Sequence, residues 1–258
     1  MTIDLCLVKI NGWPDTFDER VEIIAKNVDT LTLVRPAPEN QDGSIQADNM
    51  TTYDLYPRRG DSIDALWLHL LIFPVYVLEA MIICGFLSVR SSTRPDVFHA
   101  LDYVLGGLVV IAVSTVTGIP SVVSVRGLTG PRYKHMADET GGAIAQVNYA
   151  IVSLIPALVL PRVDAVITKA AYQETYLRRE YGLAIPIYTI PTGVDFEAFD
   201  ADEVECGTIL DQVLPEGTRP DHLILHLGRL TADKGLDRLV DLVSETDSEL
   251  PEGLSVLC

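Results

Sequence analysis

Short apolar segments of strand length alternate with longer segments of helical periodicity along most of the chain. The alternation starts with an apolar segment at residues 3–9, and residues 18–28 then place Val21, Ile24 and Val28 on one helical face. Strands that alternate with helices in this way are typical of βαβ units and a parallel sheet. The pattern therefore predicts an α/β fold built on a doubly wound parallel sheet.

The same alternation continues up to about residue 191. Residues 39–49 are polar and are expected to form a loop, and two helices are expected to end at the glycines Gly118 and Gly182. Further strands are expected at 30–36, 94–100, 120–127, 163–169 and 185–191, and further helices at 65–89, 104–118, 140–160 and 170–182.

A polar and acidic stretch between residues 195 and 221 interrupts this alternation. It carries glycine and proline near its end, a composition typical of a connector between domains. We therefore predict a first domain at residues 1–195, a linker at 196–220 and the start of a second domain at 221–258. Since one strand, one helix and the start of another strand follow the linker, the second domain is expected to be incomplete.

The apolar run at residues 65–89 is long enough to span a bilayer, for which about twenty apolar residues are usually sufficient. His69, Pro74 and Glu79 interrupt the run, and a charged side chain at mid-depth in a bilayer is costly. The sequence therefore favours a helix that packs inside the protein or lies on a membrane over one that crosses it.

Composition narrows the classes of partner. The 258 residues are 48% hydrophobic and 21% charged, with a net charge of −17 that would repel nucleic acid and anionic lipid. An acidic surface with few lysines also suits a salt-rich cytoplasm of the kind found in halophiles. The N-terminus lacks the pattern of a secretion signal, and the four cysteines form no CxxC pair, which favours a reduced cytoplasm and neither zinc nor disulfides.

The segment LHLGRLTADKGLDRLVDLV, residues 225–243, has the pattern of a buried strand, a tight turn and a helix. Arg229 lies in the expected turn beside Gly228, and Lys234 lies in the expected first turn of the helix. Two cations and a helix N-terminus at one turn are suited to binding an anion such as a diphosphate. The alternative is that Asp233 caps an ordinary helix and both cations are solvated.

Several segments together resemble the family-four (group 1) retaining glycosyltransferases of the GT-B fold. They are IPTGVDFEAF at 190–199, the 225–240 segment, and the upstream segments 18–28, 94–100 and 163–182. The resemblance implies a Rossmann-like acceptor domain followed by a nucleotide-sugar-binding domain. It also implies that Gly228, Arg229 and Lys234 bind the donor diphosphate, and that neither a metal nor another cofactor is needed.

The resemblance places the acceptor at the carboxyl ends of the strands of the first domain, where open α/β sheets bind ligands. Candidate acceptor residues are Asn11 and Gly12 after the first strand and Arg126 and Gly127 at the end of the strand expected at 120–127, while His99 is the candidate catalytic residue. Arg126 stands where the family often has histidine. An arginine there indicates an anionic acceptor or a buried ion pair.

Three functions remain open from the sequence. The first is transfer of a sugar from a nucleotide-sugar donor to a glycan or a lipid-linked acceptor, in the cytoplasm and with peripheral membrane contact. The second is epimerisation of a nucleotide-sugar on the same fold, and the third is a noncatalytic binding or remnant domain. Because the second domain is expected to be incomplete, the chain alone is expected to be inactive.

Overall fold

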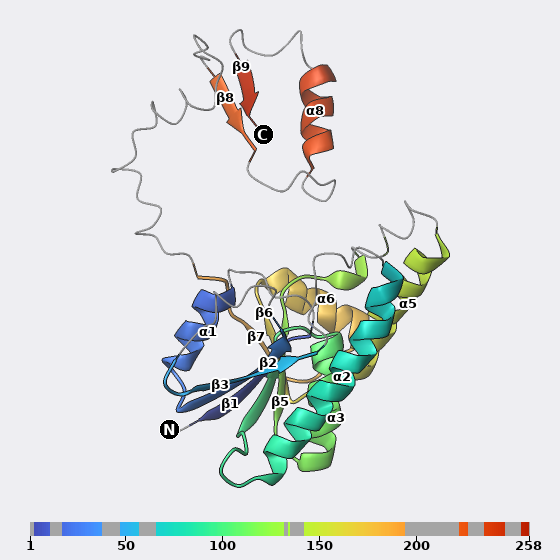
Figure 1. Ribbon diagram of the computed structural model, residues 1–258. Helices are drawn as coiled ribbons and strands as arrows, with labels where there is room; N and C mark the ends of the chain where they lie inside the picture. Colours follow the sequence, from blue (N-terminus) through green and yellow to red (C-terminus); the bar gives the residue numbers. More distant parts are fainter. Residues whose placement is uncertain are drawn as a thin grey trace. The chain divides into compact units, whose positions relative to one another are not determined.

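The computed structural model describes residues 3–10, 17–37, 47–56, 66–131, 134, 142–193, 222–226, 235–245 and 254–257. The chain divides into two compact units, Met1–Gly193 and Val194–Cys258. Figure 1 shows the elements of both units. The division does not test the roles that the sequence predicts for the two domains.

Seven strands form a single parallel sheet in the first unit (Figure 1). Their order is β3-β2-β1-β4-β5-β6-β7, and every neighbouring pair is parallel. The strands are β1 Asp4–Val8, β2 Thr30–Pro36, β3 Met50–Leu55, β4 Val97–Ala100, β5 Ser121–Val125, β6 Ala165–Thr168 and β7 Ile187–Thr189.

Helices cover both faces of this sheet. In Figure 1, α1 lies on one side of the sheet, and α2, α3 and α5 lie together on the other. The doubly wound α/β fold predicted from the sequence is thereby confirmed. The helices that the structure describes in the first unit are α1 Phe17–Ala25, α2 Leu66–Val89, α3 Leu105–Thr117, α5 Ala143–Val159 and α6 Ala171–Tyr181, with a short 3-10 helix η2 at Leu160–Arg162.

Two apolar cores follow from these two layers. Because successive strand residues point to opposite faces, Leu7 and Leu33 pack against α1, where Val21 is fully buried. Phe98 and Val123 point to the opposite face and pack in the larger core with residues of α2 and α3. Ile24 and Val28 pack against the same core as Val21, as predicted, but the helix ends at Ala25, before Val28.

Most expected elements are present at the expected places, including the helix ends. Gly118 (φ 71°) and Gly182 (φ 62°) stand in the left-handed conformation directly after α3 and α6. The strand β3 was not predicted from the sequence; it begins directly after residues 39–49, which were expected to form a loop. Most of β3 is half-buried or exposed, and it pairs with β2 at the edge of the sheet, so it lacks the apolar run that marks a central strand.

The second unit contains β8 His222–Leu225, α8 Leu236–Glu245 and β9 Leu254–Leu257, and β8 and β9 pair in parallel. The helix begins later than expected. The helix α8 starts at Leu236, directly after Gly235, which has φ 72°, whereas the sequence places its start near Asp233, outside the described residues. On the described part of this unit, Leu225 and Val240 are each 54% exposed.

Candidate functional site

Charged residues follow several strands of the first unit at one edge of its sheet. Lys9 follows β1 directly, Arg126 follows β5, Lys169 follows β6, and Asp102 lies two residues after β4. Because all strands are parallel, their carboxyl ends meet at this edge. The strand order also reverses between β1 and β4, where open α/β sheets bind ligands. We call these four residues the carboxyl-edge cluster.

Arg126 and Lys169 lie side by side, because each directly follows one of the neighbouring strands β5 and β6. Val125 pairs with Thr168, so the next residue on each strand begins the loop at the same level, and neighbouring strands lie about 4.8 Å apart. Gln173 of α6, which is only 2% exposed, holds both loops. Its Oε1 accepts a 2.9 Å hydrogen bond from the backbone N–H of Lys169, and its Nε2 donates a long one, 3.5 Å, to the carbonyl oxygen of Arg126.

The cluster is positively charged although the whole chain carries a net charge of −17. Burial lowers the pKa of Lys9, which is 8% exposed, while the charge of Asp102 acts in the opposite direction. Burial and then the charge of Arg20 lower the pKa of Arg126 to about 10. Burial, Arg126 and Arg20 likewise lower the pKa of Lys169. The cations therefore repel one another, and burial disfavours their charged forms, so a bound anion would stabilise them.

His99 is the third of the four residues of β4, and its side chain is half-buried. Its Nε2 lies 2.8 Å from the Oγ of Ser124 on the neighbouring strand. Burial, with a further contribution from the charge of Arg126, lowers the pKa of His99 from 6.5 to about 4. The ring is therefore neutral at pH 7. A neutral ring can orient a hydroxyl through a hydrogen bond, but it does not act as a general acid.

Asp102 links the cluster to the start of α3. Its Oδ1 accepts hydrogen bonds from the backbone N–H groups of Val104, at 3.2 Å, and Gly106, at 3.0 Å. Its Oδ2 is buried and has no hydrogen-bond partner in the described part of the chain. A buried oxygen without a partner is costly, so this oxygen is a candidate acceptor for a hydroxyl or a water molecule.

The loop after β5 is fixed by Tyr103, which is buried. The hydroxyl of Tyr103 accepts a 2.8 Å hydrogen bond from the backbone N–H of Thr129 and also contacts the hydroxyl of that residue. Gly127 lies within this loop, and a Cβ placed there would meet no atom of the described residues within 4 Å. The described residues therefore leave space beside the backbone of Gly127.

Five of the predicted site residues lie outside the described residues. These are Asn11, Gly12, Gly228, Arg229 and Lys234. Of the other three, Arg126 and Gly127 lie at the carboxyl edge of the sheet, and His99 lies one residue before the end of its strand. None of these placements tests the predicted roles, which stay predictions.

Sequence reasoning missed Lys9, Asp102, Lys169 and Gln173. For both lysines a signal was present, because each directly follows an apolar segment of strand length, the position at which parallel strands end. Gln173 carries no such signal. Its function depends on the adjacency of β5 and β6, which the sequence does not reveal.

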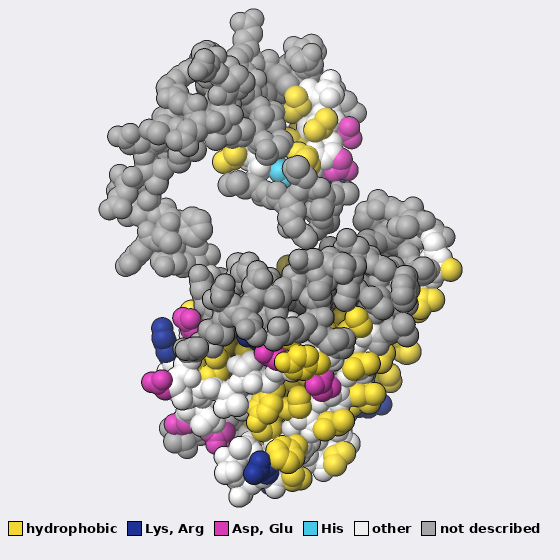
Figure 2. Space-filling view, viewed as in Figure 1, with side chains coloured by type: hydrophobic (Ala, Val, Ile, Leu, Met, Phe, Trp, Pro, Cys, Tyr) yellow, Lys and Arg dark blue, Asp and Glu magenta, His cyan; other side chains and the backbone are white. Residues whose placement is uncertain are grey.

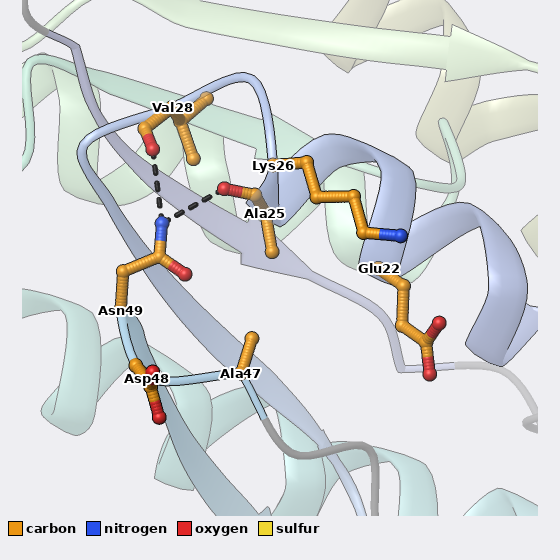
Figure 3. Close-up of a pocket in the computed structure, with 7 residues that line it drawn as sticks. All are labelled: Glu22, Ala25, Lys26, Val28, Ala47, Asp48 and Asn49. Carbon is orange, nitrogen blue, oxygen red and sulfur yellow. Dashed lines mark hydrogen bonds between the residues drawn. The ribbon is translucent and has the colours of Figure 1, made fainter.

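A hollow of about 440 Å³ lies at the opposite edge of the sheet, and Figure 3 shows Asn49 beside it. Its lining includes Lys26 and Asp48. The Nδ2 of Asn49 donates hydrogen bonds to the carbonyl oxygens of Ala25, at 2.8 Å, and Val28, at 2.9 Å. Asn49 therefore satisfies backbone groups at the end of α1, and the hollow lies far from the carboxyl-edge cluster along the strands.

Among the residues that the structure describes, no group of three or more His, Cys, Asp or Glu side chains could hold a metal ion. The expectation that the reaction needs no metal and no other cofactor stays a prediction.

The family model for Glycosyltransferase Family 4 matches residues 55–198, which is more than half of the chain and includes β4 to β7. The chain belongs to this family. The matched region contains most of the carboxyl-edge cluster, with Asp102, Arg126 and Lys169, as well as His99. Among curated protein sequences, none matches this family-4 chain significantly.

Solved structures support the same fold. Sucrose-phosphate synthase from Thermosynechococcus elongatus has a TM-score of 0.58 at 14% identity, over 98% of this chain and 69% of that chain. UGT89C1 of Arabidopsis thaliana complexed with UDP-L-rhamnose has a TM-score of 0.54 at 13% identity, over 100% and 70%. LpCGTa in complex with UDP has a TM-score of 0.55 at 9% identity, over 99% and 70%. At such identities the likeness shows the fold alone, which is that of GT-B glycosyltransferases.

Proposed function

We propose that this family-4 chain takes part in the transfer of a sugar from a nucleotide-sugar donor to a hydroxyl of a glycan or a lipid-linked acceptor in the cytoplasm. The observation that carries the proposal is the family match over residues 55–198. Two solved structures of the same fold are complexes with UDP-L-rhamnose and with UDP, which makes uridine diphosphate sugars the first donors to test.

The second unit would bind the nucleotide-sugar donor, and the first unit would bind the acceptor. When the sugar is transferred, the bond between its anomeric carbon and the diphosphate breaks, and the diphosphate keeps the electron pair. Arg229 and Lys234, with the backbone at Gly228, are proposed to stabilise that charge without a metal ion. Since these residues lie outside the described residues, this part of the proposal rests on the sequence.

The acceptor is proposed to bind at the carboxyl edge of the first unit, near Arg126 and Gly127, with Asn11 and Gly12 after β1. His99 is proposed as the catalytic residue that orients a hydroxyl, because its ring is neutral at pH 7 and half-buried beside the cluster.

An anionic group on the acceptor would suit the cluster best. Arg126 and Lys169 present two cations from neighbouring strand ends, and burial strengthens their attraction for a phosphate or a carboxylate. The other interpretation of Arg126, a buried ion pair, predicts that its removal lowers stability but leaves the affinity for the acceptor unchanged.

A transfer assay tests the proposal. The purified chain is incubated with a panel of uridine, guanosine and cytidine diphosphate sugars and candidate glycan and lipid acceptors, with and without EDTA, and products are identified by mass spectrometry. Sugar on an acceptor, unaffected by EDTA, would support the proposal and would refute the sequence-based expectation that the chain alone is inactive. Conversion of the donor with no acceptor present would instead establish an epimerase, which no observation here favours.

A further inference from the structure

The helix layer formed by α2, α3 and α5 is almost free of charge. These helices contain 24, 13 and 17 residues, and the only Asp, Glu, Lys or Arg among them is Glu79. The chain as a whole is 21% charged. The carboxylate of Glu79 accepts a 2.8 Å hydrogen bond from the backbone N–H of Tyr56, so even this charged group is hydrogen-bonded within the first unit.

The outward side of α2 is apolar along its described length. Its inward side chains, such as Tyr76, Ala80 and Cys84, are buried in the larger core. On the other side Ile82 is 72% exposed and Val89 is 79% exposed. The exposed positions recur every three or four residues and form one stripe, which comprises Val75, Leu78, Ile82, Phe86 and Val89.

A second apolar stripe follows α5 with the same spacing. It comprises Val147, Ile151, Leu154 and Leu158, of which Leu154 is 62% exposed. The α3 helix packs against both α2 and α5, so the two stripes belong to the same layer. Figure 2 shows hydrophobic side chains gathered over this layer. We call the two stripes together the apolar surface.

Folding does not require the apolar surface, since the inward side chains of α2 already fill the core. Monomeric soluble proteins rarely expose contiguous apolar patches of more than a few hundred Å², and larger ones mark contacts with proteins or membranes. The window Ile72–Val89 has a mean hydropathy of 2.1, enough to cross a membrane by length and composition, but 33% of it is buried inside the protein. A helix with one side packed in the core fits a position on a membrane better than a position across it.

The chemistry of the apolar surface favours lipid over a protein partner. Protein interfaces carry about one hydrogen bond per 100–200 Å², whereas the exposed side chains of both stripes have no hydrogen-bonding group. The surface ends in cations. Arg90 follows α2 and lies 4.9 Å from the ring centroid of Phe86, and Arg162 ends η2 at the same edge of the layer. Arginines beside an apolar surface can reach lipid headgroups while their stems stay in the apolar zone.

We propose that the apolar surface is a membrane-docking surface that rests on the bilayer and holds the first unit at the lipid interface. Burial of apolar side chains drives this docking, because the net charge of −17 opposes attraction to anionic lipid. The docking requires neither donor nor acceptor, so it stands apart from the proposed sugar transfer. If both hold, the docked enzyme would meet a lipid-linked acceptor at the membrane.

Vesicle flotation tests the proposal with the full chain. The vesicles are phosphatidylcholine alone, and phosphatidylcholine with about one fifth phosphatidylglycerol. Ile82→Asp and Leu154→Asp each place a charge on one of the two stripes. The matched control is Ile23→Asp, because Ile23 is 60% exposed on α1 at the opposite face of the sheet. Circular dichroism verifies that each variant is folded.

The wild-type chain and Ile23→Asp are expected to float with both kinds of vesicle, to stay bound in about 1 M salt and to be released by detergent. Ile82→Asp and Leu154→Asp are expected to lower the bound fraction at least tenfold while staying folded. A wild-type chain that stays in the soluble fraction would overturn the proposal. So would equal flotation of all four proteins, or a lipid-free dimer that Ile82→Asp converts to a monomer.

Discussion

Replacement of His99 by glutamine tests whether folding holds its half-buried ring in the neutral form. Burial lowers the pKa of His99 from 6.5 in the unfolded chain to about 4 in the folded one. Between these values the unfolded chain binds a proton that the folded chain does not. The free energy of unfolding therefore falls as the pH falls from 6.5 to 4. At about 1.4 kcal/mol per pH unit, the loss is about 3 kcal/mol, and this contribution is fully present above pH 6.5.

Urea unfolding between pH 4.5 and 7 measures this loss. Both tryptophans, Trp13 and Trp67, lie in the first unit, so their fluorescence reports the unfolding of that unit. Titration of the many carboxylates affects wild type and His99→Gln alike and cancels in the difference between them. The wild type is expected to lose about 2–3 kcal/mol more than the variant. Parallel curves for the two proteins would refute the burial of a neutral ring, and His226→Gln, in the other unit, serves as control.

Three further changes test the site and the fold. Arg126→Gln is expected to lower the rate of sugar transfer at least tenfold, since a charge-assisted hydrogen bond is worth about 1.5–3 kcal/mol. Arg179→Gln, at an exposed position of α6, is the control and is expected to leave the rate unchanged. Asn49→Ala removes the hydrogen bonds from Nδ2 to the carbonyl oxygens of Ala25 (2.8 Å), Val28 (2.9 Å) and Asp29 (3.2 Å), at the end of α1 and in the turn after it, and should cost about 1–2 kcal/mol in urea unfolding. No change would mean that water replaces these hydrogen bonds. Arg229→Ala and Lys234→Ala should each raise the dissociation constant for UDP about tenfold in calorimetry, and unchanged binding would favour solvated cations.

The central strands could be predicted because parallel strands are buried on both faces and therefore consist of nearly continuous apolar residues. The residues of β1 and β5 have this character. Such a signal is missing from β3, where Thr51 is exposed and Asp54 pairs with the buried Arg35 at 3.3 Å. An edge strand needs only one neighbour and one buried face, so its composition resembles that of a loop.

The site was harder to predict than the fold, for a geometric reason. A sequence can indicate that Arg126 and Lys169 each follow a strand, but it does not reveal that β5 and β6 are neighbours in register. The mutual repulsion of the cations depends on that adjacency. The same holds for Gln173, which is separated from Arg126 by 47 residues and appears in the sequence as an ordinary helical glutamine.

Replacement of Lys9 tests whether this residue of the carboxyl-edge cluster contributes to the stability of the fold or to sugar transfer. A lysine that is 8% exposed, with its pKa lowered by burial, is an expensive choice for a core position. Methionine has a similar length and no charge, so Lys9→Met removes the cost of burying the cation together with its interactions. If Lys9 serves the reaction, the variant is expected to change the free energy of unfolding by no more than about 1 kcal/mol while sugar transfer falls at least tenfold. Urea unfolding and the transfer assay measure the two effects. A variant that unfolds easily but transfers sugar normally when folded would assign Lys9 to the stability of the sheet edge instead.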